Sequence, residues 1–344
     1  MHMSTALKCL LVCLTLSMFS CDRGAPVVVV YVSTDEQVAR PVLDAFEQET
    51  GVRVLMVGDT EAQKTSGLLA RIRTERRAPI ADVLWSSEVF GTISLANDGL
   101  LAPHVSQLTE AWPLQWRDAD RRWYAFSPRP RVLVYDPARI QPSDLPASWI
   151  ELADPRWKSE VVVADPRFGT TGSHMAAMRW WMQGDHRWQS WLDSMAANDV
   201  RILPGGNAAV VDAVRTGEAL LGGTDADDVR AANRNGASLA MLPLRHGDRL
   251  GEGAMLTPNT VAIVQGAPHP RAAAMLADWL LTNDVARLLA ESVSGNVPLD
   301  STVAAEFPDL AIEDPLHMNL IEVEQHRMPA ITESVAVWGG TRAQ

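Results

Sequence analysis

Short runs of β-branched residues alternate with helical patterns along the chain, and this alternation constrains the fold more than any other feature. In the first hundred residues the strand runs are 26–32, 52–57 and 81–85. Each run precedes a stretch whose apolar residues recur at helical spacing. Further strand runs follow at 131–136, 161–164, 220–223, 241–243 and 260–264. Strands that alternate with helices form a parallel, doubly wound sheet, so the pattern predicts an α/β fold.

Small hydroxyl and carboxylate residues follow each of the first three strands, where the next helix should begin. They are Ser33 and Thr34 after the first strand, Asp59, Thr60 and Glu61 after the second, and Ser86, Ser87 and Glu88 after the third. Such residues are common helix N-caps. In open α/β sheets, however, ligands bind beyond the carboxyl ends of the strands and against helix N-termini. Since the two roles are compatible, we predict a polar binding rim along this edge.

The chain opens with a short apolar leader. Residues 9–19 are almost wholly apolar, Lys8 and the amino terminus carry positive charge, and the small Ser20 precedes Cys21. This is the layout of a secretory signal. The apolar run is shorter than the roughly 20 residues that cross a bilayer. We therefore expect the protein to work outside the cytoplasm.

Residues 18–21 resemble the lipobox of a bacterial lipoprotein signal, although the match is imperfect. The resemblance implies that Cys21 is lipidated and becomes the mature N-terminus once a signal peptide of residues 1–20 has been removed. Residues 21–26 then form a tether, and the protein is held to a membrane in the periplasm or at the cell surface. Ordinary secretion and a membrane-spanning anchor are the alternatives.

The composition excludes several classes of function. Cys9 and Cys13 leave with the leader, which removes any disulfide framework, zinc–thiolate site or thiol nucleophile. The net charge of −12 argues against nucleic acid as a partner, because phosphate binding needs clustered lysine and arginine. The sequence has none of the short motifs of serine hydrolases, metalloproteases, P-loop proteins or dinucleotide-binding enzymes. We therefore expect no enzymatic activity and no resident cofactor.

A series of short segments carries a resemblance to a known family. The segments include residues 33–36, 81–86, 127–135, 164–171, 266–270 and 295–299. Taken in this order they resemble the solute-binding proteins of ABC importers, and most closely the ferric-ion-binding branch of family 1. The resemblance implies a fold like that of type II periplasmic binding proteins, in which crossing strands join two doubly wound α/β lobes around a ligand cleft. It also implies ABC permease and ATPase subunits as partners.

The same resemblance implies where the lobes divide. The crossing strands should lie near residues 131–136 and 257–264. Lobe one is then 26–130 together with the return segment 260–344, and lobe two is 131–259. Solute would be captured between the lobes, which would close over it by a hinge motion.

The resemblance implies ferric iron as the cargo, with a carbonate-like anion bound beside it. Ferric-binding relatives usually hold iron with an adjacent pair of tyrosines. This chain has only Tyr31, Tyr124 and Tyr135, and none of them is adjacent to another. The segment that aligns with the tyrosine pair, residues 222–228, carries carboxylates instead.

Two interpretations of the cleft follow. In the first, Asp225 and Asp227 bind a hard cation such as Fe³⁺ through their carboxylates, which suit such ions. Acidic residues of the opposite lobe would assist them: Asp59, Glu61 and Glu88. Helix capping and dipole stabilisation are the other explanation for aspartates at a helix start.

In the second interpretation, the solute is a small oxyanion or an organic anion such as a phosphonate or a carboxylate, and no iron is bound. The candidate donors are Ser33, Thr34, Thr60, Ser86, Ser87, Ser127, Arg129, Arg131, Gly169, Thr170, Thr171 and Thr224. Arginine side chains and the N–H groups of helix N-termini suit anions. Trp85 would either stack on an organic ligand or seal the lobe core. A cation with its own anion would use both sets, and a ligand-sensing domain would share the fold.

Overall fold

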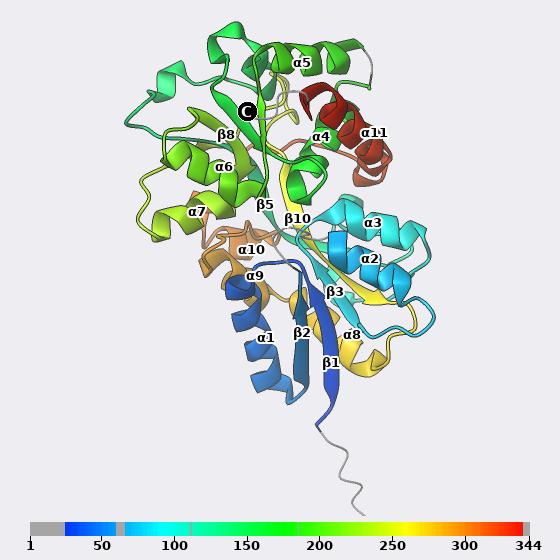
Figure 1. Cartoon of the computed structure of the whole chain (residues 1–344). Coiled ribbons are helices and arrows are strands. Elements are labelled where there is room, and N and C mark those ends of the chain that lie inside the picture. The colour runs from blue at the N-terminus through cyan, green and yellow to red at the C-terminus, as the bar shows by residue number, and fades with distance from the viewer. Residues whose placement is uncertain (1–24, 60–65, 111, 185, 340–344) are drawn as a thin grey trace, which may run out of the picture.

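The strands form one mixed sheet that runs through the molecule (Figure 1). The computed structural model describes residues 25–339 except 60–65, 111 and 185. The predicted signal peptide, Cys21, Thr60 and Glu61 therefore lie outside the described residues. The strands are β1 (Val27–Val32), β2 (Arg53–Gly58), β3 (Val83–Ser86), β4 (Leu101–Ala102), β5 (Tyr124–Tyr135), β6 (Val161–Ala164), β7 (Arg201–Leu203), β8 (Leu221–Asp225), β9 (Ala240–Leu242) and β10 (Leu256–Val264).

Helices cover both faces of this sheet (Figure 1). They are α1 (Glu36–Thr50), α2 (Ser66–Thr74), α3 (Val89–Asn97), α4 (Gly169–Trp181), α5 (His186–Ala197), α6 (Gly206–Arg215), α7 (Ala226–Arg234), α8 (Pro270–Leu280), α9 (Asn283–Glu291), α10 (Ser301–Ala304) and α11 (Leu320–Trp338). Short 3₁₀ helices are η2 (Gln107–Thr109), η3 (Leu114–Trp116), η4 (Pro142–Asp144), η5 (Trp149–Ala153), η6 (Pro155–Trp157) and η7 (Pro308–Leu310). Across the described residues, no helix combines the length and apolar character needed to cross a bilayer.

The strand order is β2-β1-β3-β10-β5-β8-β6-β7, with β4 paired to β10 and β9 paired to β5. We call β1–β3 with their helices the first half, and β6–β8 with theirs the second half. Within each half the strands pair in parallel, as the sequence pattern predicted. Strand β10 runs antiparallel to β3 and β5, and β5 runs antiparallel to β8. Every antiparallel pair of the sheet therefore includes β5 or β10.

Strand β5 belongs to both halves. Its first part pairs with β10, and its second part, from Arg131 onward, pairs with β8. All of its residues are buried. The sequence pattern detected only the second part, because Pro128 and Pro130 interrupt the first, and proline cannot donate a ladder hydrogen bond. An irregular register opposite Thr257 and Asn259 accommodates this segment.

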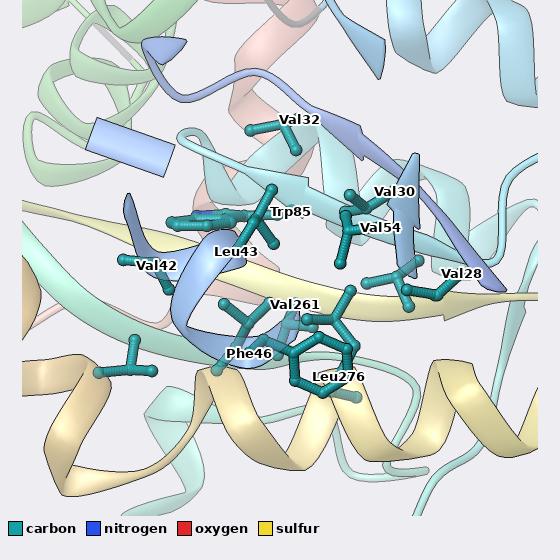
Figure 2. Close-up of a cluster of buried hydrophobic side chains, with 14 of the residues drawn as sticks. Val28, Val30, Val32, Val42, Leu43, Phe46, Val54, Trp85, Val261 and Leu276 are labelled. Atoms are coloured by element: carbon teal, nitrogen blue, oxygen red, sulfur yellow. The ribbon is translucent and has the colours of Figure 1, made fainter. Parts of the chain in front are cut away.

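Both faces of β1 are buried, which explains its unbroken apolar sequence. Val28 and Val30 pack among α1 and α8, where Phe46 and Leu276 meet them (Figure 2). Tyr31 points to the other face, toward α2 and α3. Because side chains alternate along a strand, an apolar residue at every position places side chains in both hydrophobic cores. Each fully buried valine or leucine contributes roughly 1.5–3 kcal/mol through the hydrophobic effect.

The helical segment after β10 is divided, whereas the sequence pattern predicts one long helix ending near Leu289. Helix α8 ends at Leu280, and α9 begins at Asn283. The Thr282 hydroxyl caps α9 by accepting a hydrogen bond from the Val285 N–H at 3.3 Å. A threonine at an N-cap position is therefore the local cause of the division.

The position of the C-terminal helix α11 differs from the lobe boundary that the sequence suggests. The resemblance assigns the whole of 260–344 to lobe one, yet most of α11 lies along α4 and α5 of the second half (Figure 1). Trp338 is buried there. Its indole N–H donates to the Leu192 carbonyl at 3.1 Å, and its ring centroid lies 5.6 Å from that of Trp191. The start of α11 also packs against α3, where Leu320 and Val323 join the core of the first half.

Replacing Trp338 with alanine should lower the free energy of unfolding by about 3–5 kcal/mol, because a large cavity opens between α5 and α11. Urea unfolding followed by circular dichroism measures this loss. Met328→Ala, on the same helix, is the control: Met328 is 61% exposed, so we expect a change within about 0.5 kcal/mol. Equal losses in the two variants would contradict the docking of α11 on the second half.

Candidate functional site

A cavity of about 440 Å³ lies where the two halves meet. Its wall is formed by the N-terminal ends of α1, α4, α6 and α7 together with residues of β5 and β10. Among the described residues, five aspartates and two arginines line it, accompanied by hydroxyl and amide side chains. The cavity is therefore acidic and rich in oxygen atoms.

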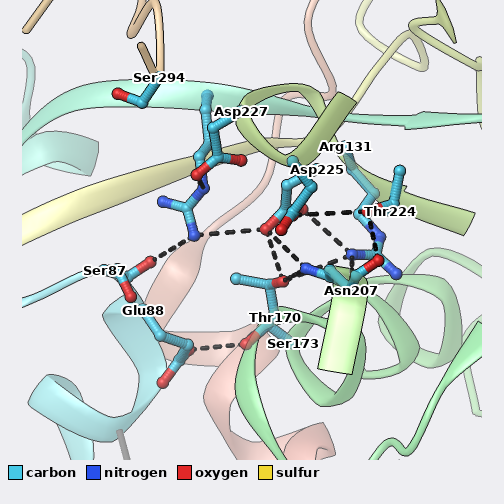
Figure 3. Close-up of polar contacts among 12 residues, drawn as sticks. Ser87, Glu88, Arg131, Thr170, Ser173, Asn207, Thr224, Asp225, Asp227 and Ser294 are labelled. Atoms are coloured by element: carbon cyan, nitrogen blue, oxygen red, sulfur yellow. Dashed lines mark hydrogen bonds and ion pairs between the residues drawn. The ribbon is translucent and has the colours of Figure 1, made fainter. Parts of the chain in front are cut away.

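Asp225 is the centre of the polar network in this wall (Figure 3). It ends β8, occupies the N-cap position of α7 and is almost fully buried. Arg129 Nη2 lies 3.3 Å from its Oδ2, and Arg131 Nη1 lies 3.1 Å from its Oδ1. The two arginines are two positions apart on β5, so they project from the same face and reach one carboxylate. A single buried anion is thus held between two buried cations.

Hydroxyl and amide groups complete the contacts of Asp225. The Thr170 hydroxyl donates to its Oδ2 at 2.6 Å, and the Asn207 amide donates to the same oxygen at 3.2 Å. Arg131 also donates to the Thr171 hydroxyl at 3.0 Å and to a backbone carbonyl of β8 at 2.9 Å. The network therefore ties β5 and β8 to the first turns of α4 and α6.

Burial and ion pairing act in opposite directions on these groups. Burial favours the neutral form of Asp225, but the charges of Arg129 and Arg131 and the hydrogen bond from Thr170 outweigh it, so the pKa of Asp225 lies below its ordinary value. Burial likewise opposes the charge of Arg129, whereas Asp227 and Asp225 raise its pKa above its ordinary value. The network stays ionised at neutral pH.

Asp225, Asp227 and Asp228 form a compact group of carboxylates. Each offers one oxygen atom, and these atoms lie within 4.8 Å of one another. Asp227 is also 3.2 Å from Arg129 Nε. Asp227 and Asp228 are only partly buried, and both line the cavity. Oxygen atoms at this spacing suit a single hard cation.

The N-termini of α4 and α6 open onto the cavity and have no acidic residue at the N-cap position. Helix α4 begins after Phe168 and α6 begins after Gly205, and neither N-cap side chain accepts a hydrogen bond from its helix. Gly169 and Gly205 have φ angles of 58° and 97°, which glycine adopts without strain. Exposed N–H groups at a helix start attract anions. The cavity thus presents anion-binding groups as well as carboxylates.

The structure brings seven of the predicted residues to the cavity wall. They are Thr34, Ser87, Arg129, Gly169, Thr170, Asp225 and Asp227. Arg131 and Thr171 lie directly behind the wall, in the network already described. Thr224 is also behind it, and its hydroxyl lies 3.4 Å from Asp228 Oδ2. That these residues bind a ligand stays a prediction.

Glu88 and Asp59 do not line this cavity, contrary to the expectation from sequence. The Glu88 carboxylate accepts two backbone N–H groups in the first turn of α3, at 2.6 and 2.7 Å, and the Ser173 hydroxyl at 2.7 Å. Asp59 accepts the Leu68 N–H in α2 at 3.2 Å. Helix capping, which was the other explanation for acidic residues at strand ends, accounts for both positions.

Trp85 and two of the predicted serines are packed behind the wall. Trp85 is fully buried and seals the core instead of facing the cavity, and its indole N–H donates to Asn259 Oδ1 at 3.1 Å. Ser33 and Ser86 are buried beside Ser87, where Ser33 Oγ accepts the Ser87 N–H at 2.8 Å. The side chains of Ser33 and Ser86 therefore hold the β1 and β3 ends together.

Ser127 acts through its backbone, whereas the sequence suggested its hydroxyl. Its φ angle of 40° is unusual for a residue other than glycine. The Ser127 carbonyl accepts the side-chain amides of Asn259 and Asn296, both at 2.8 Å. These two bonds stabilise the bend and place both asparagines in the cavity wall.

Sequence reasoning missed several polar residues of the wall: Asp35, Asn207, Asp228, Asn259 and Asn296. Asp35 and Asp228 stood inside segments that were already recognised as helix starts. Asn207 follows β7, a three-residue strand too short to give a pattern. The Gly205-Gly206 pair before it was the available signal, since paired glycines mark a tight turn.

Two histidines are buried behind the network. His174 in α4 and His246 have ring centroids 5.4 Å apart. Burial lowers the pKa of His246 from 6.5 to about 4. Burial, followed by the charges of Arg131 and His246, lowers the pKa of His174 well below its ordinary value. Both rings are therefore neutral at neutral pH.

The free energy of unfolding should fall as the pH drops from about 6.5, where unfolded histidines bind protons, toward about 4, where folded His246 does so. In this window the unfolded state binds more protons, so each histidine lowers stability by about 1.4 kcal/mol per pH unit. His246→Asn keeps a donor for the Gly253 carbonyl but cannot titrate. Urea unfolding at pH 7 and pH 5 should show a smaller loss in this variant, and an unchanged loss would contradict the assignment.

Arg131→Met should lower the free energy of unfolding by about 3 kcal/mol, because the buried Asp225 carboxylate loses one of its two cations. Arg215→Met is the matched control. Arg215 pairs with Asp212 at 2.9 Å on the surface, so its loss should cost no more than about 0.5 kcal/mol. Urea unfolding compares the two variants, and a small effect at Arg131 would show that Asp225 does not depend on it.

Comparison with known proteins gives three consistent results. A family model described as bacterial extracellular solute-binding protein matches residues 78–318. The iron uptake protein A1 of Synechocystis is 27% identical over 278 residues, which cover 76% of this chain and 74% of that protein. Two of the solved structures to which the chain is similar are the following.

The first is the apo ferric ion-binding protein A of Pasteurella haemolytica, with a TM-score of 0.78 and 21% identity over 91% of this chain and 98% of that one. The second is the Trichodesmium protein IdiA (FutA) in complex with iron and citrate, with a TM-score of 0.74 and 21% identity over 90% and 99%. These likenesses confirm the expected periplasmic binding protein fold. Because the family model covers most of the sequence, the chain belongs to the bacterial extracellular solute-binding proteins.

Proposed function

We propose that this protein captures ferric iron in the cavity between its halves and delivers it to an ABC importer. The acidic cavity is the observation that carries the proposal: three carboxylates offer oxygen atoms within 4.8 Å of one another. Ferric iron is a hard cation and prefers oxygen ligands of this kind. The similarity to an iron uptake protein of Synechocystis and to ferric-binding structures supports the same ligand.

The three carboxylates have different roles in this proposal. Asp225 already accepts hydrogen bonds from Arg129, Arg131, Thr170 and Asn207, which makes it a positioning residue. Asp227 and Asp228 line the cavity at the start of α7 and are the better iron ligands. Asp35 enters the same cavity from α1 in the first half. Closure of the two halves would bring it closer to the metal.

A small anion would accompany the metal. The starts of α4 and α6 face the cavity and offer N–H donors to such an anion. An anion alone fits less well, because five aspartates and only two arginines line the described wall. Arg129, moreover, is already paired with Asp225 and Asp227.

The remaining parts of the proposal follow from the family. The two halves act as lobes that close around the solute by bending at β5 and β10, and a permease with its ATPase receives the cargo. The protein is not an enzyme, and a ligand sensor is the alternative use of the same fold. Lipid attachment at Cys21 would hold it to the membrane. Mass spectrometry of membrane-extracted protein tests the anchor, because an unmodified Cys21 would rule it out.

An Asp227→Asn/Asp228→Asn double variant should bind Fe³⁺ at least about 100-fold more weakly, because both anionic ligands become neutral amides. Equilibrium dialysis with radioactive iron, in the presence of bicarbonate or citrate, measures the affinity. The melting temperature of the iron-free variant shows that it is folded.

Asp284→Asn/Asp309→Asn is the matched control, since both residues are exposed and neither lines the cavity. It has the same change in net charge and should bind iron as the wild type does. Wild-type protein that takes up no Fe³⁺ under any of these conditions would refute the iron proposal. Full binding by the Asp227→Asn/Asp228→Asn variant would show that iron binds at another site.

A further inference from the structure

The cavity is much larger than a bare metal ion requires. An iron atom with its ligands at about 2 Å occupies a small space, whereas pockets for organic ligands have volumes of roughly 300–1,000 Å³. The volume of about 440 Å³ falls in the second range. The space left over is therefore suited to an organic molecule that comes with the metal.

The protein itself supplies few strong iron ligands to this space. A hard cation takes about six oxygen ligands. Asp225 is held by Arg129 and Arg131, and Asp227 also pairs with Arg129, so the group offers few carboxylate oxygens to a metal. The three tyrosines of the chain are not placed to act as iron ligands in this cavity. Tyr31, Tyr124 and Tyr135 are all buried, and none of them lines it. The missing oxygen donors, phenolates included, have to come from the ligand.

Apolar residues also line the cavity, on both halves of the molecule. Val38, Ala164, Phe168, Pro204 and Ala208 all belong to its lining. Phe168 stands at the start of α4 and is 38% exposed, an uncommon state for a phenylalanine in a folded protein. The Arg167 guanidinium lies 5.8 Å from its ring centroid. An apolar wall gains nothing from a bare ion, carbonate or citrate, but it favours contact with an aromatic ring.

We propose that the cargo is a ferric complex of a small aromatic chelator of the ortho-diphenol class. Its phenolate oxygens hold the iron, since none of the three tyrosines of the chain lines the cavity. Asp227 and Asp228 complete the coordination of the metal, and the ring of the chelator packs against Phe168. This inference rests on the proposed iron function and names the chemical form in which the iron arrives.

The test compares iron–catechol with iron–citrate, using the full-length mature protein. Equilibrium dialysis gives the Kd of each complex, and the visible charge-transfer band of iron–catechol shows whether the chelate enters intact. We expect iron–catechol to bind at least about tenfold more tightly than iron–citrate. Phe168→Leu keeps the apolar volume but removes the ring, so it should weaken iron–catechol binding roughly three- to tenfold and leave iron–citrate unchanged.

Phe307→Leu is the matched control, because it makes the same change at a phenylalanine that does not line the cavity, and it should bind both complexes as the wild type does. The inference is overturned if iron–citrate binds as tightly as iron–catechol, or if metal-free catechol binds equally well. It is also overturned if Phe168→Leu weakens both complexes alike. In these cases iron or another ligand still occupies the site, whereas failure to bind iron in any form would remove the proposed function as well.

Discussion

The ion-paired carboxylate of Asp225 is the contact on which the rest of the site depends. Taking one carboxylate and two guanidinium groups out of water costs several kcal/mol for each ion, so the arrangement is stable only if every partner is present. Arg131 stands directly opposite Asp225 in the ladder between β5 and β8, which fixes the geometry through the backbone. Thr170 and Asn207 then bring the first turns of α4 and α6 to the same point. The shape of the cavity wall follows from these few contacts.

Strand β5 connects this electrostatic centre to the fold. Its side chains alternate, so Arg129 and Arg131 share the face that meets Asp225, with Arg129 in the cavity wall and Arg131 behind it. The same strand pairs with β10 in the first half and with β8 in the second. A movement of one half relative to the other would therefore change the contacts of Arg129 and Arg131 with Asp225. In the proposed function, capture of a charged solute and relative motion of the halves would therefore be linked through one strand.

The sequence predicted the fold class well because the relevant signals are local. The apolar runs of β1, β3 and β6 and the polar residues after them could be read directly from the chain. Arg129, Thr170 and Asp227 were predicted for the cleft with the help of the family resemblance. Other positions depend on tertiary context. Whether Glu88 points into a cavity or caps its own helix is decided by packing, and no local pattern distinguishes the two. The position of α11 could not be predicted either, because helical periodicity does not indicate which elements a helix packs against.

Docking of α11 on the second half has a mechanical consequence. Within the described chain, β5 and β10 cross between the halves, and the segment that leads into α11 crosses as well. Its Leu316 packs in the core of the first half and donates its N–H to the Ala254 carbonyl, just before β10, at 2.8 Å. Two side-by-side connections permit both bending and torsion. A further connection set apart from them resists torsion while leaving bending free. We therefore expect the two halves to bend relative to each other about one axis, with little torsion.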